Sequence, residues 1–468
     1  MSREKTLLKN TAIITIGKIC TQAITFFLLP LYTYILSTEE YGTVDLLNTL
    51  VSLLLPIVTF QVEQAVFRKL IDNRDKERNK KSIISTALIA VTIQCGIYLC
   101  VFFSIAPFVD NTYKYFLATN VIAYIFASLM QQIARGLGDN LKYAVGSFLS
   151  ALSTILFNIL FLVVFRFGAT GMLMANMLGQ ILCVLYYIFS LKLYRYISYK
   201  SFKKKLLKKL WSYSLPLVPN AISWWVFSGS NRVIISSMLG VAKNGIFSAA
   251  SKFSSVYITI YNIFNLSWTE TVALHINDSD AKEFLNKTIN EMLRFFVAIA
   301  VGIIAFMPIV YPIMINENYA EGYNQVPLMM IGSIFNVVVG LISAIYVAKK
   351  NTKAIASTSI ISAIINIVVS ILLINFIDLY AASIASLSAY LIMSVYRVYD
   401  IKKRYFEIKI DKTFIVSSIL VLSIILLIYY LSHSMIIYVF GILLAIVYAY
   451  IVNRKNLKAI FNMVIKRK

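Results

Sequence analysis

The basic residues of this chain are distributed in a pattern that restricts it to one structural class. Of the 44 lysines and arginines, 38 fall in every second gap between long apolar stretches, counting the two tails. The alternate gaps hold only Lys114, Arg166 and Lys243. Multi-pass membrane proteins carry such an excess of Lys and Arg in their cytoplasmic loops. The pattern therefore predicts a polytopic membrane protein with both termini in the cytoplasm.

Composition agrees with this class, because 59% of the residues are hydrophobic and only 14% are charged. A net charge of +23 would otherwise suggest a nucleic-acid partner. Here the charges follow the membrane topology, so no nucleic-acid partner is expected. The four cysteines lie in apolar stretches without CxxC spacing, and the two histidines are far apart. Neither a disulfide framework nor a metal site is therefore supported.

A membrane-spanning helix needs roughly 20 mostly apolar residues, and the sequence predicts about 14 such helices and an all-α fold. The predicted spans are 10–35, 43–67, 82–106, 113–135, 143–165, 168–190, 212–238, 245–270, 291–315, 324–347, 354–375, 379–399, 412–431 and 435–452. The longest inner connection, 191–211, is a basic amphipathic stretch that is expected to lie along the inner leaflet. Asp280 and Glu283 stand at capping-box spacing and predict a helix that runs into the ninth span.

Spans 1–6 and 7–12 form a weak internal repeat. Leu7-Leu8-Lys9 precedes the first span and Leu206-Leu207-Lys208 precedes the seventh. Because six is an even number, the two halves share one orientation, which gives a parallel repeat. The predicted domains are a six-helix lobe with its basic linker (1–205), a second six-helix lobe (206–405), and two peripheral helices with a basic tail (406–468). The two lobes are expected to surround a central cavity.

Polar residues within the spans follow single helix faces, and some of them are ionised. Charges inside a bilayer usually face water or a partner. We therefore predict a cationic substrate-binding cavity, with further polar side chains that line it or couple ions. The predicted cationic residues are Lys18, Arg135, Arg232 and Lys252. The predicted polar residues are Gln22, Asp45, Asn48, Glu63, Asn220, Asn231, Asn262 and Glu270. Structural pairing is the alternative, with Lys18 bound to Glu63, or Arg232 and Lys252 bound to Asp45.

Residues for catalysis are not found at any recognisable spacing. The glycine-rich turn Arg135-Gly136-Leu137-Gly138-Asp139 lacks the lysine and hydroxyl of a phosphate loop. No predicted outer connection exceeds about a dozen residues, which leaves little room for an outer catalytic module. The sequence thus indicates a transporter that is not an enzyme and has no cofactor. Whether H⁺, Na⁺ or membrane potential would drive it is left open.

One passage resembles a known family. It runs from Asn231-Arg232 through Leu239-Gly240 and Asn244-Gly245 to Lys252, and continues to Ser267-Trp268. It is similar to the acid–base, aliphatic, Leu-Gly and Ala-x-Lys passage of the Wzx-type polysaccharide-biosynthesis flippases. Their superfamily also includes multidrug and toxin extruders and lipid II flippases. Asn231 stands where Asp is common in the family, and Phe247 stands where Tyr is common.

The resemblance implies alternating access in the bacterial cytoplasmic (inner) membrane. The implied substrate is an undecaprenyl-pyrophosphate-linked oligosaccharide, moved to the outer leaflet for export of a cell-surface polysaccharide such as O-antigen or capsule. Implied partners are membrane lipids and other polysaccharide-assembly membrane proteins, and a monomer is the default oligomeric state. One alternative is an ion-coupled multidrug or small-solute extruder of the same fold. Another is a membrane-embedded polysaccharide polymerase or ligase.

Overall fold

The computed structural model describes residues 26–465, with side chains as far as residue 454. This part of the chain contains helices and turns but no strand, and 11 of its helices are long and apolar enough to cross a membrane. These eleven match predicted spans 2–6 and 9–14. The first predicted span lies mostly outside the described residues. The seventh and eighth are helices α10 (Val218–Met238) and α11 (Val241–His275), whose polar residues make them less apolar. The all-α, multi-pass class is confirmed.

Two compact units make up the chain, and the division falls between Gly229 and Ser230, inside α10. Unit 1 comprises residues 1–229 and unit 2 comprises residues 230–468. The domain limits predicted from the sequence, at 205/206 and 405/406, stay a prediction. Each unit is described by itself.

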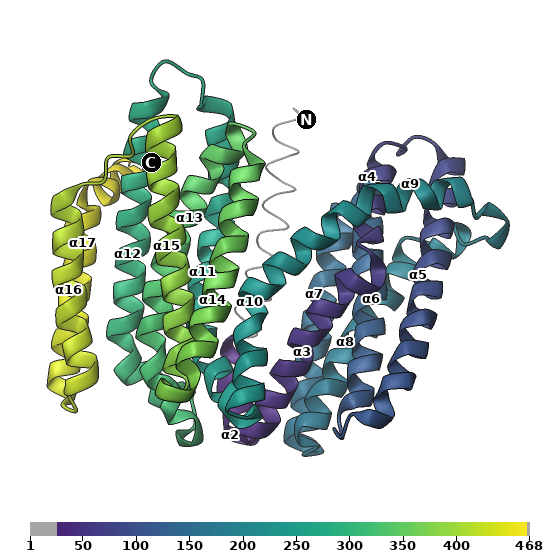
Figure 1. Cartoon of the computed structure of the whole chain (residues 1–468), viewed down its shortest axis with the longest axis horizontal. Coiled ribbons are helices and arrows are strands. Elements are labelled where there is room, and N and C mark those ends of the chain that lie inside the picture. The colour runs from purple at the N-terminus through teal and green to yellow at the C-terminus, as the bar shows by residue number, and fades with distance from the viewer. Residues whose placement is uncertain (1–25, 466–468) are drawn as a thin grey trace. The chain divides into compact units, whose positions relative to one another are not determined.

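The first unit is a helical bundle whose core lies between α4, α5 and α6 (Figure 1). Val66 of α4, Ile84 of α5 and Val121 of α6 are fully buried there. After α2 (Leu29–Ile35), its helices are α3 (Thr38–Thr59), α4 (Val62–Ile71), α5 (Glu77–Ile105), α6 (Lys114–Leu137), α7 (Asn140–Asn158), α8 (Gly168–Ser190) and α9 (Lys204–Ser214). Helix α7 continues into a π-helical turn, Ile159–Val164.

Helices α7 and α8 pack closely because one glycine leaves room for a tyrosine. A Cβ atom on Gly146 would lie 2.3 Å from the ring of Tyr187. The Tyr187 hydroxyl donates a hydrogen bond to the Tyr143 carbonyl at 2.8 Å, which fixes the ring in this position. Any side chain at position 146 would therefore have to displace a buried aromatic ring.

The second predicted span, 43–67, is broken into α3 and α4. Phe60 and Gln61 both adopt the left-handed conformation, with φ angles of 51° and 58°. The Thr59 hydroxyl stabilises this break, because it donates to the Leu55 carbonyl and accepts from the Gln61 amide at 3.1 Å. The sequence prediction of one continuous helix was wrong here, since non-glycine residues give no signal for a left-handed break.

The basic connection after α8 packs onto the bundle, as its amphipathic pattern indicates. Leu210 of α9 is fully buried against the core of unit 1, and Leu206 packs beside it. The lysines of the same helix are exposed. Long lysine side chains around an apolar stripe are typical of a helix that lies along a membrane surface.

Unit 2 contains the second half of α10 and helices α11 to α17 (Figure 1). These are α12 (Ala281–Met314), α13 (Val326–Ala348), α14 (Thr352–Ile377), α15 (Tyr380–Arg404), α16 (Lys412–Leu431) and α17 (Met435–Ile465). A 3₁₀ segment, Glu317–Gln325, precedes α13. Helix α12 begins after Asp280 as predicted, but the Asp280 side chain makes no capping hydrogen bond, so the predicted capping box was wrong.

Helices α16 and α17 pack on α12, which agrees with their predicted peripheral place. Arg294 of α12 pairs with Asp411 at the start of α16 at 2.5 Å. At the other end of α16, the ring of Tyr429 stacks on Tyr323 with centroids 4.2 Å apart. The Tyr429 hydroxyl also donates to the Tyr323 carbonyl at 2.6 Å. Both ends of α16 are thus attached to the rest of unit 2.

Two of the three basic residues that break the charge pattern have local structural partners. Lys243 pairs with Glu321 at 2.5 Å and with Asp378 at 2.8 Å. Lys114 donates to the carbonyls of Ala106 and Val109 at 2.9 and 2.8 Å. These lysines tie together the connections in which they lie, which accounts for their presence in the gaps that are otherwise poor in Lys and Arg.

Candidate functional site

A cluster of amides and hydroxyls is buried in unit 2, where α10, α14 and α15 meet. The Asn231 side-chain amide donates to the Ser386 hydroxyl at 2.8 Å and to the Ala382 carbonyl at 3.1 Å. The side-chain amide of Asn366, on α14, donates to the side-chain oxygen Oδ1 of Asn231 at 3.2 Å and to the Ser230 hydroxyl at 3.3 Å. Asn231 is 5% exposed and Asn366 is fully buried. The cluster has no carboxylate among these partners, so it is neutral.

Arg232 follows this cluster in the sequence and reaches α11. Its guanidinium donates to the Ser251 hydroxyl at 3.3 Å. Lys252 is the next residue on α11, and both basic side chains are half-buried. The structure therefore brings the two ends of the motif passage, Asn231-Arg232 and Ser251-Lys252, into contact within one unit.

The polar stripe along α11 uses acceptors in its own helix. The hydroxyls of Ser255 and Thr259 donate to the carbonyls of Ser251 and Ser255, each at 2.8 Å. Asn262 and Glu270, farther along α11, are exposed in unit 2. Both hydroxyls therefore donate within α11 rather than to a neighbouring helix.

In unit 1 the predicted polar residues Asp45 and Asn48 lie on α3 and are half-buried. The side-chain amide of Asn176, on α8, donates to the side-chain oxygen Oδ1 of Asn48 at 3.4 Å. Asn220 lies near the start of α10 and is exposed. The same part of α10 is attached to α3, because the Trp225 indole donates to the Thr49 carbonyl at 2.8 Å.

Glu63 lies inside the packed core of unit 1, directly after the break between α3 and α4. Its side chain is 2% exposed and lies beside Thr59. Gln94 of α5 donates to the Thr59 carbonyl at 3.3 Å. Within the described part of the chain, Glu63 Oε2 and Gln94 Oε1 are both buried and accept no hydrogen bond. A buried acceptor without a donor is costly, so these two oxygens are unsatisfied polar atoms in the core of unit 1.

Arg135 lies at the end of α6, between aromatic rings. Its guanidinium is 4.6 Å from the centroid of Phe67 and 5.5 Å from that of Tyr143. It also donates to the Gln132 side chain at 3.2 Å. These contacts hold the ends of α4, α6 and α7 together. Lys18 and Gln22 lie outside the described residues.

A buried cation that sequence reasoning did not single out lies in α15. Arg397, which the charge pattern assigns to a cytoplasmic connection, is only 1% exposed. Its Nη2 atom donates to Thr358 at 2.7 Å and to Ser359 at 3.1 Å, and its Nε atom donates to Thr358 at 3.0 Å. Its Nη1 atom donates to Ser343 of α13 at 2.5 Å. The available signal was the hydroxyl stripe of the eleventh span, because those hydroxyls are its acceptors.

Each unit holds polar groups within its apolar helices. Within the described residues, no group of three His, Cys, Asp or Glu side chains could hold a metal ion. The predicted cationic residues Arg232 and Lys252 lie on α10 and α11 of unit 2, and Arg232 contacts Ser251, the residue before Lys252. Arg135, in unit 1, is held by aromatic rings.

Solved structures with the same fold are membrane transporters and a flippase. The lipid II flippase MurJ, in an inward closed conformation, matches with a TM-score of 0.69 at 14% identity, over 96% of this chain and 100% of that chain. An inward-facing multidrug resistance MATE family transporter of the MOP superfamily gives 0.68 at 12% identity, over 84% and 99%. An outward-facing MATE transporter gives 0.56 at 13% identity, over 85% and 95%. At these identities the likeness establishes the fold.

The match to MurJ extends into the C-terminal helices. It leaves 4% of the 468 residues unmatched, which is about 19 residues. Helices α16 and α17 together span 412–465, which is longer than that, so at least part of them is matched. No curated protein sequence matches the chain significantly. The family described as polysaccharide biosynthesis protein matches residues 7–269, which is more than half of the chain. With its helical spans, its fold and this match, the chain belongs to the polysaccharide biosynthesis protein family.

Proposed function

We propose that this protein is a flippase for a lipid-linked oligosaccharide. The substrate is an undecaprenyl-pyrophosphate-linked oligosaccharide, which the protein moves from the inner to the outer leaflet of the cytoplasmic membrane for export of a surface polysaccharide. The observation that carries the proposal is the family match over 7–269 together with a flippase fold that extends into α16 or α17.

The contacts in unit 2 support an anionic substrate. Arg232 and Lys252 are basic residues on helices that the sequence predicts to span the membrane, and placing such residues there is costly. A pyrophosphate group carries the opposite charge and would be attracted to both residues. The neutral Asn231–Asn366 cluster beside Arg232 contributes no competing carboxylate.

The test is transfer of an undecaprenyl-pyrophosphate-linked oligosaccharide between leaflets in proteoliposomes. We expect transfer by the native protein and loss of at least about tenfold in rate for the double variant Arg232→Ala/Lys252→Ala, because each removed charge costs on the order of 1 kcal/mol or more. The matched control is Lys353→Ala/Lys403→Ala, which removes two exposed charges from connections and should leave transfer unchanged.

Other outcomes would point elsewhere. Transfer that survives in the Arg232/Lys252 double variant would keep the flippase function and discard these two residues as substrate ligands. An absence of transfer, combined with uptake of small organic cations, would favour an extruder of the same fold. Collapse of an imposed H⁺ or Na⁺ gradient during transfer would identify the coupling ion, and transfer that is indifferent to both gradients would exclude ion coupling.

A further inference from the structure

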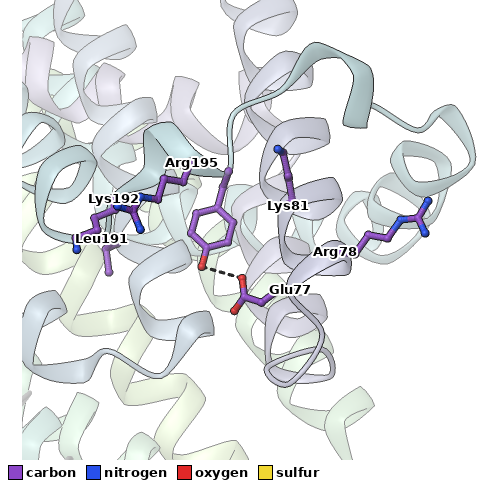
Figure 2. A pocket seen from close by; sticks show the side chains of 7 residues that line it. Glu77, Arg78, Lys81, Leu191, Lys192 and Arg195 are labelled. Atoms are coloured by element: carbon purple, nitrogen blue, oxygen red, sulfur yellow. Dashed lines mark hydrogen bonds between the residues drawn. The ribbon is translucent and has the colours of Figure 1, made fainter.

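A basic cleft opens in unit 1 where α5 begins and α8 ends (Figure 2). Its volume is about 520 Å³, which lies within the range of ligand pockets, roughly 300–1,000 Å³. Four of its seven lining residues are basic: Arg78, Lys81, Lys192 and Arg195. Figure 2 shows Lys192 and Arg195 on one side of the cleft and Lys81 and Arg78 on the other, with Arg78 directed outward.

The acidic residue that lines this cleft, Glu77, already has two partners within the protein. Glu77 pairs with Lys80 at 2.6 Å and accepts a hydrogen bond from the Tyr196 hydroxyl at 3.1 Å. Burial raises the pKa of Tyr196 above its usual value, and the hydrogen bond to Glu77 raises it further. The phenol therefore stays protonated and acts as a donor. Among the described side chains, no carboxylate lies within ion-pair distance of the four basic residues. The cleft therefore carries uncompensated positive charge.

The wall formed by residues 191–198 is fixed in place before any ligand binds. Leu193 is fully buried beneath it. The Ser85 hydroxyl of α5 donates to the Tyr196 carbonyl at 2.6 Å and accepts from the Ser198 amide at 3.1 Å. Lys192 itself is held in the left-handed conformation, with a φ angle of 52°. A pre-organised wall loses less conformational entropy when it binds a ligand.

The depth of the cleft indicates where its ligand comes from. Helix α8 ends at Ser190 and helix α5 begins at Glu77, a few residues before its apolar stretch. The cleft thus lies at the ends of two helices that are long and apolar enough to span a membrane, which is the level expected for lipid headgroups. Tyr194 and Ile197 in the same wall, and Tyr199 directly after it, are exposed. Tyrosines are enriched at this level of the bilayer, where they present an apolar ring and a polar hydroxyl.

We propose that this cleft binds the phosphate group of an anionic phospholipid from the leaflet in which α5 begins, with Lys81, Lys192 and Arg195 as its ligands. Tyr194, Ile197 and Tyr199 would contact the glycerol and upper acyl region of the same lipid. A soluble phosphate offers the same charge but gains nothing from these exposed apolar side chains. This site is separate from Arg232 and Lys252 and does not depend on the flippase function.

The experiment is a titration of the full-length protein, in a neutral detergent, with dioctanoyl-phosphatidylglycerol, and bound lipid is counted by native mass spectrometry. The test variant is Lys81→Gln/Lys192→Gln/Arg195→Gln. A basic residue near a membrane surface contributes roughly a factor of five to the binding of anionic lipid, so we expect roughly 100-fold weaker binding. Dioctanoyl-phosphatidylcholine should bind native protein and variant equally weakly.

The control is Lys350→Gln/Lys353→Gln/Lys403→Gln, which removes the same charge from exposed positions in unit 2. It is matched at one further point, because Lys350, like Lys192, has a positive φ angle. Unchanged phosphatidylglycerol binding by the cleft variant, or an equal loss in the control, would overturn the proposal. Displacement of phosphatidylglycerol by equimolar inorganic phosphate would assign the cleft to a soluble anion. Displacement by a substoichiometric polyprenyl pyrophosphate would make it a substrate site, and either result contradicts a phospholipid site.

Discussion

The side-chain amides of Asn231 and Asn366 face each other inside unit 2, at 3.2 Å and 3.5 Å for the two donor–acceptor pairs. The two amides hydrogen-bond each other, and both are buried. They connect α10, which carries the motif residue Arg232, to α14, and Ser386 extends the cluster to α15.

Removal of either amide removes hydrogen bonds from this buried cluster. We expect Asn231→Ala and Asn366→Ala each to reduce the free energy of unfolding by about 1–3 kcal/mol. The double variant should lose clearly less than the sum of the two, because the hydrogen bonds between the two amides are lost in either single variant and are counted once. Denaturant unfolding of the purified protein in detergent measures all four corners of this cycle. Strict additivity would show that the two amides are not coupled.

Replacement of Arg397 is expected to change stability little, because two of the hydroxyls that it contacts also make other hydrogen bonds. The Thr358 hydroxyl also donates to the Ala354 carbonyl at 2.7 Å, and the Ser343 hydroxyl donates to Val339 at 2.6 Å. Arg397→Met should therefore change stability by less than about 1.5 kcal/mol, as for other buried ions that are replaced by apolar side chains of similar size. Thr358→Val removes an acceptor from two guanidinium donors and should cost about 3 kcal/mol.

The ranking of these variants is the test. Thermal unfolding should place Thr358→Val below Arg397→Met, and the double variant Thr358→Val/Arg397→Met should recover most of the loss. A severe loss in Arg397→Met with a mild one in Thr358→Val would contradict this expectation and would mean that the guanidinium itself stabilises the fold.

The contact between α7 and α8 allows a matched glycine pair. Gly146→Ala would place a methyl group into the Tyr187 ring and should cost about 1–3 kcal/mol through overpacking. Gly96→Ala is the control, because no atom lies within 4 Å of its added Cβ. That variant should be neutral or slightly more stable, since alanine favours helix over glycine by up to about 1 kcal/mol. Equal melting temperatures for the two variants would contradict the close packing.

Glu63 is expected to tolerate the loss of its acidity. Glu63→Gln keeps the shape of the side chain and replaces one orphaned carboxylate oxygen with an amide group. We predict that this variant unfolds at the same or a higher temperature, with a gain of up to about 1 kcal/mol. Glu63→Ala, which leaves a cavity, should unfold at a lower temperature. A strong loss of stability in Glu63→Gln would indicate an ionised carboxylate with a cationic partner.

The sequence predicted helices wherever apolar length alone decides the outcome, as in predicted spans 2–6 and 9–14. It failed at Phe60 and Gln61, because their left-handed conformation depends on the Thr59 hydroxyl and on packing that no local pattern records. For the site, the motif drew attention to Asn231 and Arg232, whose role in binding stays a prediction. The partners of these residues, Asn366 and Ser251, required the tertiary arrangement of helices that are distant in the sequence.

Arg397 shows the limit of charge counting. Its place near the end of a predicted span makes it look like one more basic residue of a connection. Only the positions of Thr358, Ser359 and Ser343 on two other helices reveal that it is buried. Likewise, Lys81, Lys192 and Arg195 are unremarkable in the sequence, since α5 and the end of α8 are separated by about a hundred residues.

The attachment of α16 at both of its ends has a mechanical consequence. A helix held by Asp411–Arg294 at one end and by Tyr429–Tyr323 at the other has no hinge about which it can swing away from α12. Any rotation of α12 is therefore expected to move α16 and α17 together with it. The outer surface of α17, where Ile436 and Phe440 are exposed, would then report the tilt of unit 2 directly to a probe attached there.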